Sequence, residues 1–315
     1  MTGLGKGTSG APSTWRVAVK KIRRDPELYL LLVPPLACIL VFKLAPLAWL
    51  GMAFQDYNIF KGMLGSPFVG LKHFQRLFTD AGALNALINT LIISLYRFVV
   101  LFPAPIILAL MLNEVRSRAY KRTIQTVVYL PHFLSWVVAG SMVLTLLQYN
   151  GGMVNELLLM LGFQPVNFLA EKSMFRSILV ISSAWKDVGW NSILYLSAIM
   201  AIDPALYEAA EIDGAGRFRK IWHITMSGIA DTIVVLMLLR IGSMMASNMD
   251  QVLMLYNPLV YETGDVIDTY VYRQGISKME YSFSTAVGLF NSAVGFILLI
   301  IANFTSNRVS GRGIW

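Results

Sequence analysis

The chain has 315 residues, of which 56% are hydrophobic and only 14% are charged, and its mean hydropathy is +0.60. Because about a quarter of the residues in a soluble globular domain are charged, this composition excludes such a domain and indicates a membrane protein. The net charge of +8 would suggest a nucleic-acid partner in a soluble protein. In a membrane protein its distribution reports orientation instead, so no nucleic-acid partner is expected.

Residues 1–27 form a Gly/Ser/Pro-containing tail that becomes basic toward its end. It shows no signal-peptide cleavage pattern, and the apolar run that follows is too long for the hydrophobic region of a signal peptide. We therefore expect this tail to stay in the cytosol. The single cysteine, Cys38, lies in the apolar run, so no intrachain disulfide is possible.

Six apolar segments follow the tail, and each approaches or exceeds the ~20 residues that cross a bilayer. They cover residues 28–52, 86–112, 125–147, 175–200, 229–246 and 284–304. Pro34, Pro35 and Pro46 predict kinks in the first of them. The sequence therefore predicts an all-α polytopic membrane protein with one membrane domain, residues 28–304, and a C-terminal tail, residues 305–315. A long polar loop is expected over residues 247–282.

Lysines and arginines give the orientation of these spans. Outside the spans they gather in the N-terminal tail, in the loop 116–122, in the segment 203–228 and after the last span, while fewer lie in the longer alternate loops. By the positive-inside rule, both termini and the segment 203–228 are expected in the cytosol.

The polar segment 203–228, DPALYEAAEIDGAGRFRKIWHITMSG, interrupts this apolar chain. Asp203 followed by Pro204 predicts a capped helix start, and Gly214 and Gly216 predict that the helix ends in a tight or left-handed turn. A second, basic helix should follow. A pair of interfacial helices lying on lipid would explain the basic helix, but not an Ala-Ala pair that is flanked by glutamates and followed by Asp-Gly-Ala-Gly.

This segment resembles the EAA loop of ATP-binding-cassette (ABC) importer permeases, with Glu-Ala-Ala, then Asp-Gly-Ala, then Ile-Thr. The chain departs from that pattern at Ser227, where the family usually has a proline, so a softer helix break is expected there. Residues 188–210 and 248–275, with YLPHFLSW at 129–136 and FPAPIILALMLNE at 102–114, are similar to permeases of carbohydrate importers. Within that group they resemble the branch for complex, acidic oligosaccharides such as alginate or rhamnogalacturonan fragments.

The resemblance implies the type I ABC importer permease fold and a set of partners. These are a second permease subunit encoded by a different chain, a dimer of ATPases, an extracytoplasmic solute-binding protein and an oligosaccharide, in the cytoplasmic (inner) membrane of a bacterium. ATP and Mg would be bound by the ATPase, because the chain contains no GxxxxGK[ST] motif, and no cofactor or catalytic residue is expected here. The resemblance assigns ATPase coupling to Glu208, Ala209, Ala210, Asp213, Gly214 and Gly216.

The resemblance also places the sugar path in the fourth span and around the end of the fifth. Polar residues inside spans are functional candidates because they are costly to bury in lipid. Those on this path are Lys186, Asp187, Trp190, Asn191, Arg240, Ser247, Asn248 and Asp250. A cationic Lys186 or Arg240 would suit a carboxylated sugar, and Trp190 could stack on a sugar ring.

Structural roles compete with these assignments. Arg97 and Arg240 could instead bond carbonyls or acids at a subunit interface, and Trp190 could serve packing as well as sugar stacking. The three histidines are dispersed along the chain without metal-ligand spacing, so no metal site is expected.

Three classes of function are left open by the sequence: an importer permease, a polytopic membrane enzyme and a secondary transporter. A membrane enzyme would need a convergent set of catalytic groups, which the spans do not show, and a secondary transporter usually has more spans and a coupling-ion site. The 203–228 segment favours the first class, with another solute class as the alternative to oligosaccharides.

Overall fold

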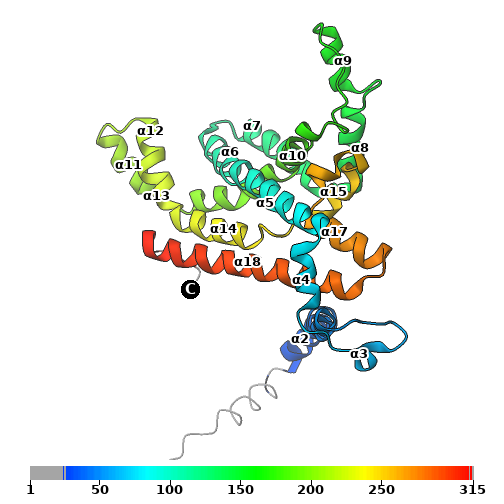
Figure 1. Ribbon diagram of the computed structural model, residues 1–315. Coiled ribbons are helices and arrows are strands. Elements are labelled where there is room, and N and C mark those ends of the chain that lie inside the picture. Colours follow the sequence, from blue (N-terminus) through cyan, green and yellow to red (C-terminus); the bar gives the residue numbers. More distant parts are fainter. Residues whose placement is uncertain (1–23, 25, 312, 314–315) are drawn as a thin grey trace, which may run out of the picture. The chain divides into compact units, whose positions relative to one another are not determined.

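The computed structural model describes residue 24, residues 26–311 and residue 313, so most of the predicted basic tail and the end of the C-terminal tail lie outside the described residues. The described chain consists of helices joined by turns, with one isolated antiparallel bridge between Gln55 and Phe68 (Figure 1). The all-α prediction is confirmed. Residues from Met52 onward form one compact unit, and the first span is described by itself.

Three helical stretches are continuous and apolar enough to cross a membrane: Pro26–Phe54, Ala81–Glu114 and Tyr281–Arg308. Three further candidate spans are helix pairs that bend sharply at a short break. If each bent pair is one span, the described residues contain six, which is the number predicted from the sequence.

The first span changes its helix type along its length. It begins as α2 (Pro26–Ile39), which contains Pro34 and Pro35, and continues as a π-helical turn, η1 (Leu40–Leu44), and a 3₁₀ segment, η2 (Ala45–Phe54). Proline removes a backbone donor from the helix ladder, and π and 3₁₀ turns are common where that ladder is disturbed. Pro34 and Pro35 lie within α2, Pro46 lies at the start of η2, and the helical span continues past all three.

The second span begins at Ala81, earlier than predicted. It consists of α5 (Ala81–Leu101) and α6 (Pro103–Glu114), and the Asp80 side chain caps α5 by accepting a hydrogen bond from the Ala83 amide at 2.9 Å. The third predicted span is bent. The segment predicted as one span over 125–147 divides into α7 (Arg118–Tyr129) with the turn η3 (Leu130–Phe133), and α8 (Trp136–Leu147).

The two helices of this third pair bend by 103°. Pro131 has no amide to continue α7, and the Ser135 side chain starts α8 by accepting a hydrogen bond from the Val138 amide. The segment 125–147, which the sequence predicts as the third span, therefore contains a sharp bend.

The fourth span is confirmed as α10 (Lys172–Met200), a helix of 29 residues. It bends by 67° into α11 (Pro204–Ile212). The chain then forms α12 (Arg217–Lys220), a π turn η4 (Ile221–Thr225) and α13 (Met226–Gly228), and bends by 61° into the fifth span, α14 (Ala230–Gly242). A clear break thus persists at Ile229 although Ser227 replaces the usual proline.

The predicted polar loop 247–282 is a compact set of short helices with a buried core. It contains α15 (Met249–Leu255), η5 (Pro258–Val260), α16 (Tyr261–Gly264), α17 (Ile267–Tyr272) and η6 (Arg273–Ser277). Val252, Val260 and Val266 are fully buried. A hydrogen bond from Arg273 to Asp265 raises the pKa of the Arg273 guanidinium. The segment is polar on average, so the sequence did not indicate that these valines form a core.

Other connections are short helices, namely α3 (Gly62–Gly65), α4 (Lys72–Thr79) and α9 (Met153–Met160). The last span, α18 (Tyr281–Ser310), runs on beyond residue 304, so the predicted C-terminal tail begins as helix.

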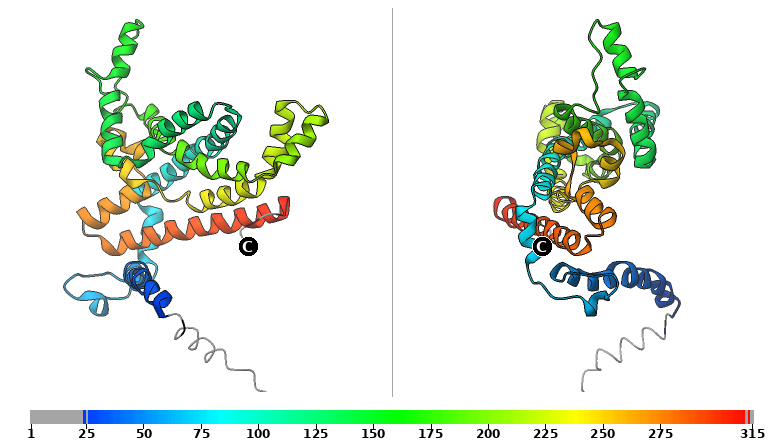
Figure 2. Two further views of the ribbon diagram at one scale, coloured as in Figure 1. Left: turned by 180° about the vertical axis from the view of Figure 1, so that it is seen from behind. Right: turned by 45° about the vertical axis from the view of Figure 1, so that its right-hand side comes forward.

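The core of the unit that begins at Met52 lies in three clusters. One joins α5 and α10 to the 247–282 segment, and its buried residues include Ile93, Phe175 and Val252. A second joins α4, α5, α17 and α18 around Leu77 and Phe283. The third joins α6, α10 and the start of α14, where α6 and α10 lie close together (Figures 1 and 2).

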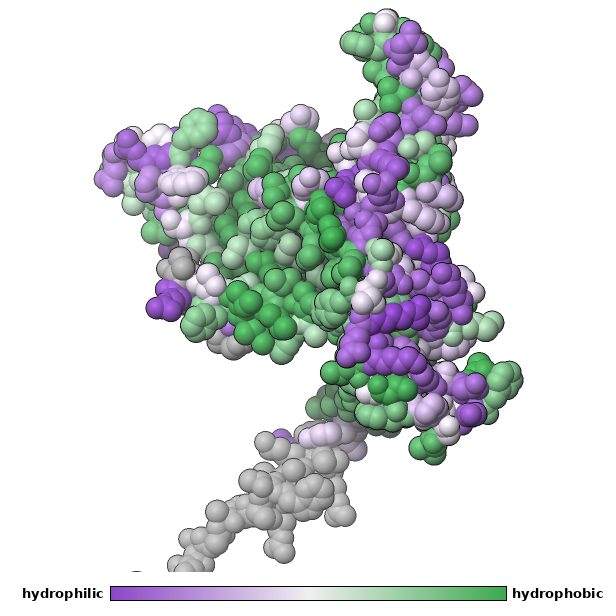
Figure 3. Space-filling view, viewed as in Figure 1, coloured by the Kyte–Doolittle hydropathy of each residue, from purple (hydrophilic) through white to green (hydrophobic). Residues whose placement is uncertain are grey.

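Apolar side chains are also exposed over the middle of the helices, as expected for a surface that faces lipid. Examples are Ile107, Phe296 and Ile300, which are 55%, 62% and 44% exposed. Figure 3 shows this apolar belt between a hydrophilic patch over α11 and α12 on one side and a hydrophilic flank over the 247–282 helices on the other.

Candidate functional site

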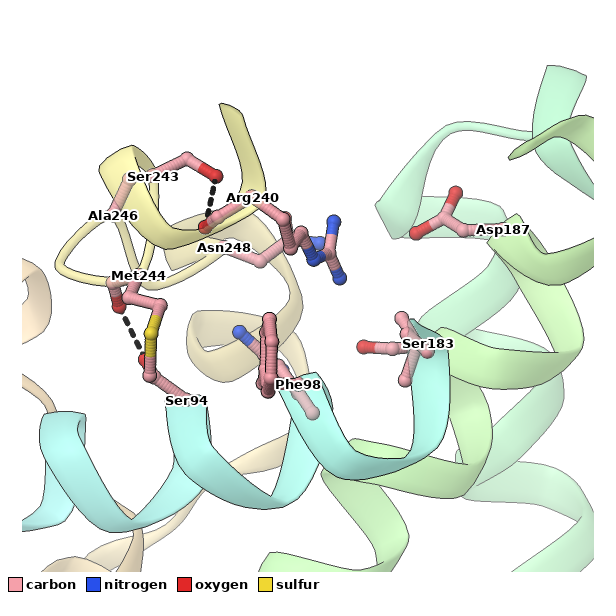
Figure 4. A pocket seen from close by; sticks show the side chains of 11 residues that line it. Ser94, Phe98, Ser183, Asp187, Arg240, Ser243, Met244, Ala246 and Asn248 are labelled. Carbon is pink, nitrogen blue, oxygen red and sulfur yellow. Dashed lines mark hydrogen bonds between the residues drawn. The ribbon is translucent and has the colours of Figure 1, made fainter. Parts of the chain in front are cut away.

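A cavity of about 140 Å³ lies where the second, fourth and fifth spans meet. Figure 4 shows Arg240 and Asn248 on one side of it and Asp187 and Ser183 on the other, with Phe98 of α5 between them. Three of the predicted path residues, Asp187, Arg240 and Asn248, therefore line one cavity. Its other lining residues are Ser94, Arg97, Phe98, Leu101, Ser183, Ser243, Met244 and Ala246.

Arg97 reaches this cavity from α5 and is only 7% exposed. One of its terminal nitrogens donates a hydrogen bond to the side-chain oxygen of Gln251, and its Nε is buried with no hydrogen-bond partner. A neutral amide, rather than an acid, thus contacts this cation.

Arg240 enters the cavity from α14 and is half-buried. Its backbone carbonyl accepts a hydrogen bond from Ser243 at 3.0 Å, but its guanidinium has no hydrogen bond or ion pair among the described residues. A second cavity of about 210 Å³ shares Arg240, Leu101 and Ser243 with the first and is also lined by Asn191. Asn191 therefore lies beside, and not within, the cavity that holds the arginines.

Asp187 is held by His132, whose Nδ1 lies 3.0 Å from the Asp187 carboxylate. The His132 ring stacks on Trp190, with ring centroids 4.6 Å apart and planes 5° from parallel. Trp190 is 40% exposed. Asp187 and Trp190 of α10 thus both contact His132, which lies at the break between α7 and α8.

Lys186 is turned away from the cavity. It is 5% exposed, and its Nζ donates hydrogen bonds to the backbone oxygens of His132 at 2.6 Å and Pro131 at 3.3 Å. These carbonyls lie in the turn where α7 ends, and the Pro131 carbonyl also accepts a hydrogen bond from the Leu134 amide at 3.2 Å. Lys186 therefore satisfies the carbonyls of the 103° bend.

We expect Lys186→Met to destabilise the protein without changing the interaction with the sugar. Two charge-assisted hydrogen bonds are lost, and each is worth about 1.5–3 kcal/mol. Thermal unfolding of the detergent-purified complex would show a lower midpoint, while uptake per folded complex would stay near wild type. A normal unfolding midpoint together with impaired uptake would return Lys186 to the sugar path.

The other two path candidates lie apart from the cavity. Ser247 is buried and donates from both its amide and its hydroxyl to the Asp268 carboxylate, at 2.9 and 2.7 Å. Asp250 is exposed and does not line either cavity.

At the end of the helices that carries α11 and α12, the 203–228 segment forms the predicted pair of short helices. The Asp203 side chain caps α11 by accepting from the Ala205 amide at 2.9 Å, and Gly214 adopts the left-handed φ of +72° that the turn requires. Gly216 differs from the prediction: with a φ of −67° it is the residue that starts α12.

This pair stands away from the packed helices (Figures 1 and 2). No residue of α11 or α12 is buried, and Glu208 and Ala209 are exposed on α11. Ile212 and Phe218 are 87% and 85% exposed. A hydrogen bond of 2.9 Å between Tyr207 and Thr225 joins α11 to the turn η4, and Arg217 of α12 forms an ion pair with Glu114 at the end of α6. The segment is therefore an exposed surface with firm attachments to the spans.

Sequence reasoning did not assign Gln251 and His132, and it gave Arg97 a structural role. The structure places all three beside the cavity or against its lining. The signal that could have found Arg97 is its charge inside a span, whereas Gln251 lies in the segment taken for a polar loop and carries no such signal.

Comparisons with known proteins show that this chain is similar to membrane components of transport systems. A family described as "Binding-protein-dependent transport system inner membrane component" matches residues 102–311. The polygalacturonan/rhamnogalacturonan transport system permease protein YteP of Bacillus subtilis (strain 168) is 44% identical over 300 residues, which are 95% of this chain and 93% of that protein. Protein LplB of the same organism is 42% identical over 308 residues, or 98% and 96%.

Solved structures agree. A chain in the crystal structure of a bacterial ABC transporter involved in the import of the acidic polysaccharide alginate is 41% identical, with a TM-score of 0.85 over 93% of this chain and 99% of that one. A further structure, of the bacterial alginate ABC transporter in complex with an alginate pentasaccharide-bound periplasmic protein, gives the same TM-score and identity over 94% and 99%.

Proposed function

Since the chain belongs to the family of binding-protein-dependent transport system inner membrane components, the permease subunits of ABC importers, we propose that it moves acidic oligosaccharides across the cytoplasmic membrane. The predicted identity as a carbohydrate ABC importer permease is confirmed by this membership. The proposal adds the class of sugar, the residues that it meets and the partners that supply energy.

The observation that carries the proposal is the placement of Asp187, Arg240 and Asn248 around one cavity between three spans. The acid of this cavity, Asp187, is paired with His132, and cations in a span without an ion pair favour a substrate that brings its own negative charge. The relatives support the same class, because YteP is a polygalacturonan/rhamnogalacturonan transport permease and the solved transporter is involved in the import of the acidic polysaccharide alginate.

The partners form the second part of the proposal. The exposed 203–228 segment, with Glu208, Ala209, Ala210, Asp213, Gly214 and Gly216, docks onto a separate ATPase dimer that binds ATP and Mg. A periplasmic binding protein accompanies the alginate transporter, and we propose a solute-binding protein here as well. A second permease of different sequence completes the membrane part.

Orientation follows from the distribution of charge. With Arg217, Arg219 and Lys220 on the 203–228 segment and Arg116, Arg118 and Arg122 in the preceding cationic loop, the positive-inside rule puts both on the cytosolic side. Both termini are then cytosolic, and the 247–282 helices face the solute-binding protein. ATP-driven movement of the exposed pair would be passed to α6 by the Arg217–Glu114 ion pair.

Purification of the complex through this chain tests the proposal. An ATPase, a second permease and ATP-driven uptake of oligogalacturonate or oligoalginate in proteoliposomes with the binding protein are expected. Uptake of neutral oligosaccharides alone would overturn the acidic substrate class. Uptake driven by an ion gradient in the absence of an ATPase would overturn the role of the 203–228 segment.

A further inference from the structure

We infer that Arg97 and Arg240 together bind a carboxylate group of the transported sugar, and that Gln251 holds Arg97 in position for this contact. The inference rests on the proposed import of acidic oligosaccharides and names the residues of this chain that confer the preference.

Arg97 is a buried cation that lacks an acid. Arg97 is only 7% exposed, and its Nε has no hydrogen-bond partner. The one terminal nitrogen that is bonded donates to the uncharged side-chain oxygen of Gln251. Removing one partner of a buried charge, or never supplying it, costs several kcal/mol. A carboxylate arriving in the cavity would supply the missing acceptor.

Hydrogen bonds at both ends of the Gln251 side-chain amide fix its orientation. Gln251 is completely buried, and its amide nitrogen donates to the Leu179 carbonyl and to the Ser182 hydroxyl, each at 2.8 Å. Its oxygen accepts from the Ser183 hydroxyl at 2.9 Å and from Arg97. Exchanging the oxygen and nitrogen would bring two donors together at Arg97, so the amide is fixed with its oxygen toward the cation.

Gln251 therefore restrains Arg97 without neutralising it. A glutamate at this place would have formed an ion pair with the arginine and cancelled its charge. A fixed guanidinium loses less rotational freedom when it binds a ligand, which favours affinity. Gln251 is in this sense a positioning residue and does not itself contact the sugar.

The balance of charge in the cavity favours an anion. Arg97 and Arg240 both line it, and neither has an ion pair among the described residues. The opposing acid, Asp187, is already paired with His132 at 3.0 Å. Guanidinium groups match the geometry of carboxylates, while Ser183 and Asn248 on the two sides of the cavity (Figure 4) offer hydrogen bonds to hydroxyl groups.

The test uses the complete transporter in proteoliposomes, with its ATPase, companion permease and a binding protein saturated with oligogalacturonate. Uptake and ATP hydrolysis are measured together for Arg97→Gln, Arg240→Gln and the two arginine-to-lysine variants. Lys172→Gln is the matched control, since Lys172 is an exposed cation that pairs with Glu262 and lies away from the cavity.

We expect the sugar moved per ATP hydrolysed to fall roughly tenfold in each Gln variant, the effect of losing one close charge pair. The lysine variants should recover part of it, and Lys172→Gln should match wild type. Asp187→Asn should raise the ratio, because it removes a charge that repels the carboxylate and retains a hydrogen-bond partner for His132. A purely structural role for these residues would not give effects of opposite sign.

Three results would overturn the inference. A ratio in Arg97→Gln and Arg240→Gln that equals wild type would remove both arginines from the sugar path and leave the proposed function intact. Equal losses in the Gln and Asp187→Asn variants, with lower unfolding midpoints in all of them, would make the cluster structural. Failure of the wild-type transporter to take up acidic sugar would overturn the proposed substrate class itself.

Discussion

Glu208→Lys is expected to abolish productive coupling, so that both the amount of ATPase retained on purification and ATP-driven uptake fall by about tenfold or more, as charge reversal at an interface commonly does. Glu208 is exposed on α11 and lines a cavity together with Arg116, Arg217 and Lys220. A lysine there would add a cation to three others and remove the acid that the segment presents to its partner.

Glu156→Lys is the matched control for this variant. Glu156 is an exposed glutamate in the first turn of α9; its side chain has no ion pair among the described residues, and it does not line the cavity beside α11. Retention of the ATPase should be unaffected in this control. Quantitative immunoblotting of co-purified subunits and uptake in proteoliposomes measure both variants. Wild-type values in Glu208→Lys would show that α11 does not carry the coupling contact.

Properties set by local residue patterns could be read from the sequence. The fourth span is a mostly apolar run without proline and forms α10 close to its predicted bounds. The 203–228 segment contains its own cap and its own turn glycine, so Asp203 and Gly214 act as predicted. These features depend on neighbours within a few residues, and such neighbours are visible in the sequence.

Features that depend on distant contacts could not be read in the same way. Hydropathy averaged over a window does not register Pro131 and predicts a single span, whereas the chain bends there and α10 supplies Lys186 to the carbonyls of the turn. Lys186 and Asp187 are neighbours in sequence, yet one serves this bend and the other lines the cavity.

The candidate site shows the same division. Ionisable residues in spans are few, so Asp187 and Arg240 were found from charge alone, and the structure brings them to one cavity. Gln251 could not be found, because its function depends on four hydrogen bonds made across α5, α10 and α15. Charge predicts which residues are unusual, but only packing shows which of them face the same space.

Gly189→Ala is expected to have a large effect on assembly of the protein. A Cβ at residue 189 would lie 1.9 Å from the backbone oxygen of Val128 and 2.5 Å from its carbonyl carbon. Because the obstacle is backbone, no side-chain rotation can relieve it, and α10 would have to move away from α7. Glycine at helix contacts in membranes permits this close approach.

Separation of α10 from α7 would also pull Lys186, Asp187 and Trp190 from the 131–132 turn that they hold. The loss should therefore exceed the ~1–3 kcal/mol that overpacking usually costs, and little folded complex should be recovered from membranes. Gly288→Ala in α18 is the matched control, since a Cβ there meets nothing within 4 Å. Size-exclusion profiles and unfolding midpoints should be normal for Gly288→Ala and lost for Gly189→Ala. Equal behaviour of the two variants would mean that α7 and α10 do not pack at Gly189, and the bend would need another explanation.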